Sequence, residues 1–341
     1  MLEANDFSRG GKLTAVVGLR PQNIARGISL IIAAALAISI QDVVFKLFSG
    51  ELTLWQIFCL RGVLVIPMLF AACWVSGAQR GILEAALGKW PLLRSMFITA
   101  SLLAFYGALP FLSLSTVGAA NYIAPIFITL LSAYAIREPV GPLGWLGVCL
   151  GFAGVVVLLQ PGTDAFSPWA LLPIVGAASY ALAHITTRAR CQNVPLAALS
   201  LSQNIVMLLA GAVVSLSMLW LQPQGTFADA YPYIFGAWSK VGLNDWLVLT
   251  LLAGFAIING MLLGGAYQTA PPAVVSTFEY SYLVFVTLWD ILFFGIAPSA
   301  ASISGMVLIV VAGLLVLRRK RAVRTESGDV MSGAQKSDIV T

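Results

Sequence analysis

The chain has 341 residues, of which 59% are hydrophobic and 10% are charged, and its mean hydropathy is +0.92. Soluble domains carry roughly 25% charged residues, so this chain has too few charges to cover a folded surface in water. The composition therefore predicts a protein solvated by lipid. The net charge of +5 does not indicate nucleic-acid binding, because the basic residues flank hydrophobic segments, where they orient membrane helices.

Charge-free runs predict membrane-spanning helices along the whole chain. The longest, Ser95–Ile136, has 42 residues, and one crossing takes about 20, so this run holds two crossings. Turn-forming residues separate ten predicted spans, at 26–48, 52–76, 90–111, 115–136, 141–160, 167–187, 195–221, 245–268, 272–294 and 298–317. The boundary at Ser113–Thr116 is apolar on both sides, so nine or eleven spans remain alternatives.

The ends of the chain and its Lys and Arg residues predict the orientation. Residues 1–25 are mixed polar, and the small residues at 33–37 resemble a signal-peptide cleavage region. The apolar stretch nevertheless runs on through Phe48, which favours an uncleaved first helix. A cytoplasmic N-terminus puts sixteen of the nineteen Lys and Arg residues on the inner side and only Lys46 and Lys240 outside. Residues 318–341 then form a basic, disordered cytoplasmic tail, and the aromatic outer loop 222–244 rests on the membrane surface.

The two halves of the chain, 26–160 and 167–317, are predicted to be repeats. Trp145–Val155 resembles Gly305–Leu314, although the glycine spacing differs by one residue, and Ala108–Pro125 loosely resembles Gly264–Tyr282. Five is an odd number of spans, so the two copies have opposite topology. Inverted repeats place a solute site at their interface near the bilayer midplane.

Each charged residue within a predicted span raises the free energy of membrane insertion by about 2.5–3.5 kcal/mol, so each one is a candidate for a structural or functional role. Asp42 and Lys46 are four residues apart and share one helical face. Arg61 follows across a short hairpin at a similar depth to Asp42. We predict that Asp42 and Arg61 contact a solute or a proton; the alternative is a structural ion pair between them. Lys46 either joins this site or extends to the outer surface.

Glu279 is the strongest candidate for proton coupling or solute contact. It lies about 12 Å into a hydrocarbon core ~30 Å thick, where a lone carboxylate needs a proton or a cation. The alternative is an acid that packs helices together. We expect Asp290 to face the outer surface, and His184, near Arg188, to pack at the inner interface.

Uncharged polar and aromatic side chains are predicted to line the same interior. Asn121 and Tyr122 precede Pro125, which frees backbone carbonyls within its span, and Tyr280 and Tyr282 follow Glu279. Further candidates are Gln203, Asn204 and Asn259. For each of them the alternative is helix packing.

The sequence contains no signature of catalysis or cofactor binding. Four scattered cysteines, one histidine and no Cys-x-x-Cys make a metal, haem or disulfide framework unexpected, and no cofactor is predicted. There is no nucleophile elbow and no phosphate-binding loop. The protein is therefore not expected to be an enzyme. A membrane enzyme would need reactive side chains at one membrane face, and a receptor or scaffold would need large soluble loops.

Several motifs resemble the EamA branch of the drug/metabolite transporter superfamily. They are Gln41–Lys46, Phe58–Gly62, Asn121–Pro125, Arg137–Pro139, Trp145–Gly154 and Phe278–Ser281 leading to Pro298. The resemblance implies an all-α integral membrane protein of ten helices in two inverted five-helix repeats, with both termini cytoplasmic and a central cavity. Where the second repeat of the family often has Glu before Pro, this chain has Ile296-Ala297-Pro298, whereas Glu138 is present in the first repeat.

These observations together predict a secondary-active transporter of a bacterial inner membrane. Its solute is expected to be a small metabolite, namely a vitamin such as riboflavin, an amino acid or a nucleoside-like compound. Protons or another ion would drive transport, lipids would surround the protein, and no nucleic acid would bind. Rocking of 26–160 against 167–317 would expose a shared polar centre to each side of the membrane in turn.

Overall fold

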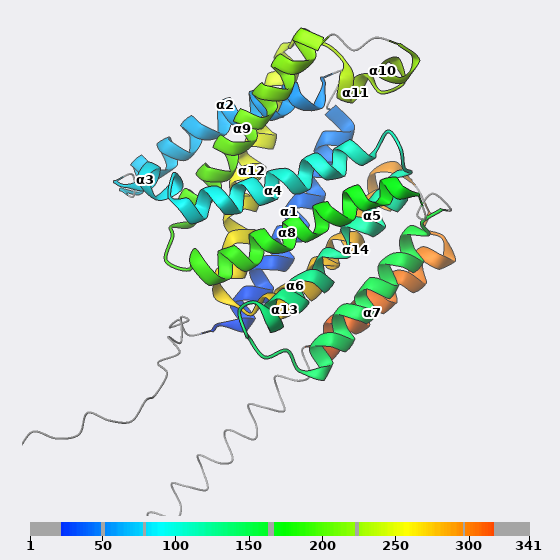
Figure 1. The fold of residues 1–341 in the computed structure, drawn as a ribbon. Helices are drawn as coiled ribbons and strands as arrows, with labels where there is room; N and C mark the ends of the chain where they lie inside the picture. The colour runs from blue at the N-terminus through cyan, green and yellow to red at the C-terminus, as the bar shows by residue number, and fades with distance from the viewer. Residues whose placement is uncertain are drawn as a thin grey trace, which may run out of the picture.

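A computed structural model describes residues 22–48, 52–77, 80–162, 167–221, 225–295 and 297–316. Within these ranges, every regular element is a helix (Figure 1). The predicted N-terminal segment, apart from residues 22–25, and the predicted C-terminal tail lie outside the described residues.

Nine of the ten predicted spans are long and apolar enough to cross a membrane. Seven of them are the helices or helix cores α1 (Ile24–Phe48), α2 (Leu54–Val75), α4 (Lys89–Ala108), α7 (Pro142–Leu159), α8 (Leu171–Arg190), α9 (Leu196–Leu221) and α12 (Leu243–Thr269). Two are split, into α5 (Leu114–Asn121) with α6 (Ala124–Tyr134), and into α13 (Pro272–Glu279) with α14 (Ser281–Phe294). The tenth forms a shorter apolar helix, Ala300–Val316. The prediction of a multi-pass helical membrane protein is thus confirmed.

The first split follows from proline chemistry. Pro125 has no N–H to continue the helix, and its ring disfavours the helical path before it. The N–H of Ile126 donates to the Ile123 carbonyl at 2.9 Å, one residue short of the normal partner. The carbonyl of Tyr122 is therefore free to accept a hydrogen bond from elsewhere.

The second split, at Tyr280, has no proline beside it and was not predicted. The N–H of Leu283 donates to the Tyr280 carbonyl at 3.1 Å, a tightened turn. The hydroxyl of Ser281 donates to the Phe278 carbonyl at 2.7 Å and replaces a helical donor. A local side-chain bond of this kind lets the backbone leave the helical path.

Helices of the first half pack mainly on helices of the second half. Figure 1 shows α4 beside α8, and α1 also packs along α12, while α2 packs along α9 and α6 along α13. Each span of the first half has a counterpart five spans later in the second half. If every span is exchanged with its counterpart, the same set of contacts results. For example, the exchange turns the α1–α12 contact into the α8–α4 contact.

Glycines allow the closest helix contacts. A Cβ added at Gly154 of α7 would lie 2.8 Å from the carbonyl oxygen of Gly305, and one added at Gly305 would lie 2.6 Å from the Gly154 carbonyl. Both distances are shorter than carbon and oxygen tolerate, so only glycine fits. Figure 1 shows α7 beside the helix Ala300–Val316, where these backbones meet.

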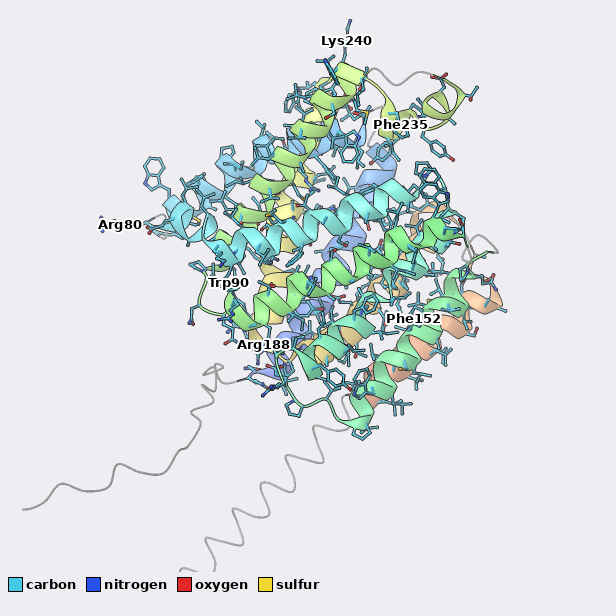
Figure 2. The ribbon with its side chains drawn as sticks, viewed as in Figure 1. Arg80, Trp90, Phe152, Arg188, Phe235 and Lys240 are labelled. Atoms are coloured by element: carbon cyan, nitrogen blue, oxygen red, sulfur yellow. The ribbon has the colours of Figure 1, made fainter. Side chains whose placement is uncertain are left out.

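The two ends of the bundle differ in composition. Figure 2 shows Arg80, Trp90 and Arg188 toward one end, and Phe235 and Lys240 at the opposite end.

Three short helices lie outside the spans: α3 (Ile82–Ala86), α10 (Thr226–Ala230) and α11 (Pro232–Phe235). A 3₁₀ turn, η2 (Pro168–Ala170), leads into α8.

The outer loop packs more closely on the protein than the sequence predicted. The indole of Trp55 in α2 donates to the Ile234 carbonyl at 2.7 Å, and the hydroxyl of Tyr231 donates to the Pro110 carbonyl at 2.9 Å. Ile234 is buried. The described part of this loop is therefore docked on the bundle.

Candidate functional site

Each of the two predicted carboxylates is held by tyrosine hydroxyls. Asp42 of α1 accepts a 2.6 Å hydrogen bond from Tyr282 of α14. Glu279, at the end of α13, accepts one of 2.6 Å from Tyr267 of α12 and one of 3.2 Å from Tyr180 of α8. The Glu279 carboxylate thus connects three spans of the second half, and Asp42 connects the first half to the second.

Tyr122 lies between these two acidic centres, at the break in the fourth span. Its ring centroid is 6.1 Å from that of Tyr280 and 6.4 Å from that of Tyr282. Tyr282 holds Asp42, and Tyr280 directly follows Glu279 in the chain. The two helix breaks therefore bring both carboxylates and three aromatic rings into one neighbourhood.

Arg61 does not pair with Asp42 in this structure. One guanidinium nitrogen, Nη2, donates to the sulfur of Met207 at 3.5 Å, and Cζ lies 5.7 Å from the ring centroid of Phe58. The buried Nε has no hydrogen-bond partner. The alternative of a structural ion pair is therefore not seen in this structure: Tyr282 donates to an Asp42 oxygen, while Arg61 turns toward α9.

A second buried arginine, Arg94, was missed as a site residue because the sequence placed it among the inner-side charges. It is only 2% exposed within α4, and it donates to the hydroxyl of Thr187 at 3.0 Å and to the Leu199 carbonyl at 3.5 Å. Thr187 lies on α8, the helix whose Tyr180 also donates to Glu279. Arg94 therefore brings a positive charge against the helix that helps to hold Glu279.

His184 is fully buried in the same cluster. Its ring stacks on Tyr267 with centroids 4.0 Å apart and meets the edge of Tyr180 at 4.2 Å. Neither ring nitrogen has a hydrogen-bond partner. Its contacts are those of a packing residue, and they support the two tyrosines that hold Glu279.

An ion pair at the Arg188 end of the bundle was also missed. Nε of Arg188 donates to Oε1 of Glu138 at 2.7 Å, and its Nη1 donates to the Gln268 carbonyl at 3.0 Å. Arg188 is 0% exposed and Glu138 is 5% exposed. The pair connects the segment after α6 to α8 and α12, and so joins the two halves. Arg188 looked like a loop charge in the sequence because it is followed by Arg190.

Two predicted residues contribute structure rather than open polar surface. Tyr280 is fully buried, and its hydroxyl donates to the carbonyls of Tyr122 at 3.3 Å and Val148 at 3.5 Å. Asn121 ends α5 and is partly buried beside Tyr122. Lys46 belongs to α1, but its side chain lies outside the described part of the structure.

The remaining candidates mostly connect helices. The amide of Asn259 donates to Gln41 at 3.0 Å, and that of Gln203 donates to Thr99 at 3.4 Å. Asn204 donates to a carbonyl of its own helix at 2.8 Å. Asp290 is partly buried near the end of α14. These contacts favour the packing alternative.

The central residues keep partial access despite their depth. The side chains of Asp42, Arg61, Tyr122, Glu279 and Tyr282 are all partly exposed, although each lies within a candidate span. Among the described residues, no group of three or more His, Cys, Asp or Glu side chains is arranged to hold a metal ion. The arrangement offers acids for protons or cationic groups, and aromatic faces for stacking.

Comparison with known proteins gives a family match for the first half of the chain. Residues 25–160 match the EamA-like transporter family. This part of the chain is similar to the EamA family. The matched residues contain Asp42, Arg61 and Tyr122, and they end where the first predicted repeat ends.

Several proteins similar to this chain are named as transporters of different solutes. The chain is 22% identical to the S-adenosylmethionine uptake transporter of Rickettsia felis over 85% of its own length and 92% of that protein. It is 29% identical to the riboflavin transporter of Rhizobium johnstonii over 58% of this chain and 59% of that protein. It is 22% identical to the pseudopaline exporter of Pseudomonas aeruginosa over 86% of this chain and 97% of that protein.

The chain also shares its fold with a protein of known crystal structure. The two match with a TM-score of 0.70 at 19% sequence identity, over 86% of this chain and 98% of the other. The chain is thus a multi-pass membrane protein similar to transporters of small metabolites.

Proposed function

We propose that this protein is a secondary-active transporter that moves a small metabolite across a bacterial cytoplasmic membrane by alternating access. The observation that carries the proposal is the meeting of both helix breaks at the Tyr122–Tyr280 contact. Broken helices at a repeat interface are where secondary transporters place their solute sites.

Inverted repeats are supported by the contact pattern of the helices. Residues 26–160 and 167–317 would form the two copies, with Ala300–Val316 as the tenth span. The exchange symmetry of the contacts, together with the breaks in the fourth and ninth spans, is what a two-fold axis in the membrane plane produces. The basic end that carries Arg80 and Arg188 would face the cytoplasm, with both termini on that side.

The substrate class follows from the side chains around the breaks. Asp42 and Glu279 would attract a cationic or hydrogen-bond-donating group, and Arg61 an anionic or carbonyl group. Tyr122 and Tyr282 would stack on a flat ring. A ring-bearing metabolite with donors and acceptors at its edges fits best, which includes flavins, nucleoside-like compounds and aromatic amino acids.

Glu279 is the proposed coupling group, with a proton as the coupling ion. When Glu279 is ionised, the hydroxyls of Tyr267 and Tyr180 donate to it, as the structure has them. Both hydroxyls donate to Oε1, so a proton taken up by Glu279 would go to Oε2 and leave both bonds in place. These bonds would weaken, because they would no longer go to a charged acceptor, and the weakening would link proton binding to the packing of α8, α12 and α13.

The proposal is tested by uptake of labelled riboflavin, S-adenosylmethionine and amino acids into proteoliposomes, with and without a pH gradient. We expect accumulation of one compound by the wild type, and loss of at least tenfold in rate for Glu279→Gln and Asp42→Asn. The matched control is Glu84→Gln, the same change of charge at an exposed position on α3, which should transport normally. Equal rates for all four proteins would remove both acids from the mechanism.

Two other functions make different predictions in the same assay. A membrane enzyme would return the labelled compound chemically changed, which mass spectrometry of the vesicle contents would detect. A receptor or scaffold would bind the compound saturably without accumulation.

A further inference from the structure

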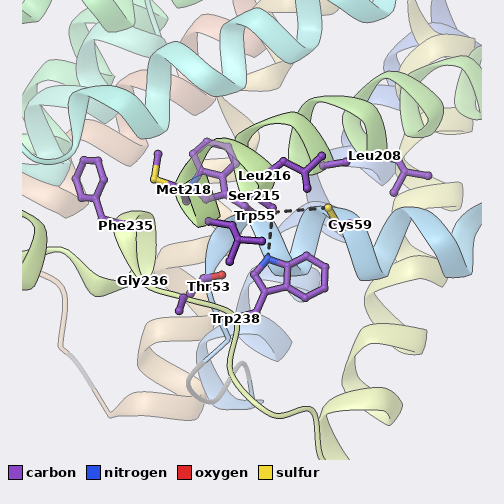
Figure 3. Close-up of a pocket in the computed structure, with 13 residues that line it drawn as sticks. Thr53, Trp55, Cys59, Leu208, Ser215, Leu216, Met218, Phe235, Gly236 and Trp238 are labelled. Carbon is purple, nitrogen blue, oxygen red and sulfur yellow. Dashed lines mark hydrogen bonds between the residues drawn. The ribbon is translucent and has the colours of Figure 1, made fainter. Parts of the chain in front are cut away.

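A large cavity lies away from the central site, between α2, α9 and the segment 236–239. Its volume is about 750 Å³, within the range of ligand-binding pockets. Figure 3 shows it lined mainly by apolar and aromatic side chains, with Thr53, Ser215 and Cys59 as the polar ones. None of Asp42, Arg61, Tyr122 and Glu279 lines it.

Close packing of α2 and α9 below the cavity makes its floor. A Cβ at Gly211 of α9 would lie 3.1 Å from both Cys59 Sγ and Phe58 Cβ, and a Cβ at Gly62 would lie 2.9 Å from Leu208 Cβ. Cys59 and Leu208 also line the cavity. The two helices therefore touch at small residues toward the bilayer centre and leave space between them toward the Lys240 end.

The segment 236–239 covers the cavity and is held on both sides. The Trp238 indole donates to the Ser215 hydroxyl of α9 at 3.1 Å (Figure 3). On the other side, Gln56 of α2 donates to the Ser239 carbonyl at 2.8 Å and accepts from the Ser239 N–H at 3.1 Å. The cover is thus fixed to both helices, and the cavity is a formed site.

The polar side chains at the cavity are occupied or enclosed within the protein. The Ser215 hydroxyl accepts from the Trp238 indole and lies 4.0 Å from Cys59 Sγ. The hydroxyl oxygen of Thr53 is enclosed by the protein and does not face the cavity. The cavity therefore presents an almost wholly apolar surface, which fits a hydrocarbon chain.

The mouth of the cavity opens on the surface that faces lipid. Leu216 and Leu219 line the cavity and are 65% and 70% exposed, and their neighbour Trp220 is 85% exposed. In the membrane, side chains exposed at this depth meet acyl chains. A ligand that enters here comes from the bilayer and is largely hydrocarbon.

We propose that this cavity binds one acyl chain of a membrane phospholipid, from the leaflet at the Lys240 end. The chain would lie between α2 and α9 under the segment 236–239, against Leu208 and Cys59. The site is separate from the proposed solute site, and its occupation does not depend on transport.

The test uses the buried thiol of Cys59 as a reporter. A protein with Cys73→Ala, Cys149→Ala and Cys191→Ala keeps only this cysteine. In detergent, N-ethylmaleimide should label it at least tenfold more slowly after dioleoyl phosphatidylethanolamine is added. Dihexanoyl phosphatidylethanolamine, with the same headgroup and short chains, should protect weakly. Equal protection by both lipids would assign the site to a headgroup and overturn the proposal, as would protection by riboflavin or an amino acid.

Cavity-filling variants separate this cavity from the rest of the lipid-facing surface. Ala212→Phe places a ring in the cavity, and retention of phosphatidylethanolamine, measured by native mass spectrometry, should fall at least tenfold. Val213→Phe puts the same ring on the next residue, which is 62% exposed and not part of the lining. It should retain lipid as the wild type does. Equal retention by both variants would refute the site.

Discussion

The buried Glu138–Arg188 pair yields the sharpest prediction about stability. Arg188→Met removes the 2.7 Å bond to Glu138 and the 3.0 Å bond to the Gln268 carbonyl, and it leaves a buried carboxylate without a cation. Breaking a buried ion pair from one side costs about 3–5 kcal/mol, and the Arg188→Met cost should fall in this range. Glu138→Gln should cost less, because an amide oxygen still accepts from Nε and the Gln268 carbonyl still accepts from Nη1.

The double variant decides whether the two side chains act as a pair. With both charges removed, no ion is left buried and unpaired, so the combined cost should be smaller than the sum of the single costs. Residues in direct contact typically show coupling of about 0.5–3 kcal/mol, and a buried pair with this geometry should lie at the upper end. The free energy of unfolding is measured by titration with sodium dodecyl sulfate in mixed micelles.

Additive costs in that double-mutant cycle would refute the reasoning. They would mean that each residue acts through its own surroundings and that the 2.7 Å contact contributes little. Lys89→Met, a loss of charge at the start of α4 on the same side of the bundle, is the control. It should change the free energy of unfolding by less than about 1 kcal/mol, as exposed charges do.

Three further predictions concern packing, the Glu279 cluster and a buried thiol. Gly154→Ala should destabilise the protein by about 1–3 kcal/mol, because its Cβ meets a backbone oxygen. Gly254→Ala, at a helical position with open space, should be neutral or stabilise by up to about 1 kcal/mol in the same unfolding assay. Tyr267→Phe removes a 2.6 Å hydrogen bond to the Glu279 carboxylate and should lower the free energy of unfolding by about 1.5–3 kcal/mol. Tyr134 is 75% exposed, so Tyr134→Phe should not change it measurably.

Burial raises the pKa of the Cys191 thiol from 9.0 to about 11, against a smaller opposing effect of Arg94. The thiolate is the reactive form, so iodoacetamide at pH 8 should alkylate Cys191 about a hundredfold more slowly in the native protein than in the unfolded protein. The rate is measured by mass spectrometry of the peptide that contains Cys191. Equal rates in the two states would show that the thiol is not buried.

The spans were predictable because lipid imposes a long, charge-free pattern that few other structures share. The boundary at Ser113–Thr116 was correct because the charge-free run of 42 residues is about twice one crossing, and α4 indeed ends at Ala108 while α5 starts at Leu114. The break at Pro125 follows from a missing N–H. The break at Tyr280 depends on the hydrogen bond from Ser281 to the Phe278 carbonyl. Serine makes such bonds in unbroken helices too, so this break could not be predicted from the sequence.

The central site was only partly predictable. Asp42 and Glu279 could be picked out because a carboxylate in an apolar span is rare. Their partners Tyr282, Tyr267 and Tyr180 come from three other spans, and local pattern does not say which way a tyrosine points. Proximity in sequence suggested Asp42 with Arg61, but the side-chain directions of α1 and α2 decide otherwise.

The buried basic residues near the ends of the spans were not identified from the sequence. The inner-side bias of Lys and Arg makes any basic residue at a span edge look like an orientation signal, and Arg94 and Arg188 both fit that pattern. Their burial depends on polar partners from other spans, Thr187 and Glu138 respectively. Only the three-dimensional packing brings these partners together.

The bond from the Tyr280 hydroxyl to the Tyr122 carbonyl has a consequence for how the halves communicate. The bend of the fourth span exposes that carbonyl, and the side chain that satisfies it is itself the residue at which the ninth span bends. Straightening the ninth span would leave the Tyr122 carbonyl without this partner in a region without water, where such a loss costs several kcal/mol, whereas the Tyr280 hydroxyl also donates to the Val148 carbonyl. The bend of the ninth span therefore stabilises the bend of the fourth, and a movement of one half reaches the other half through this contact, without passing through any loop.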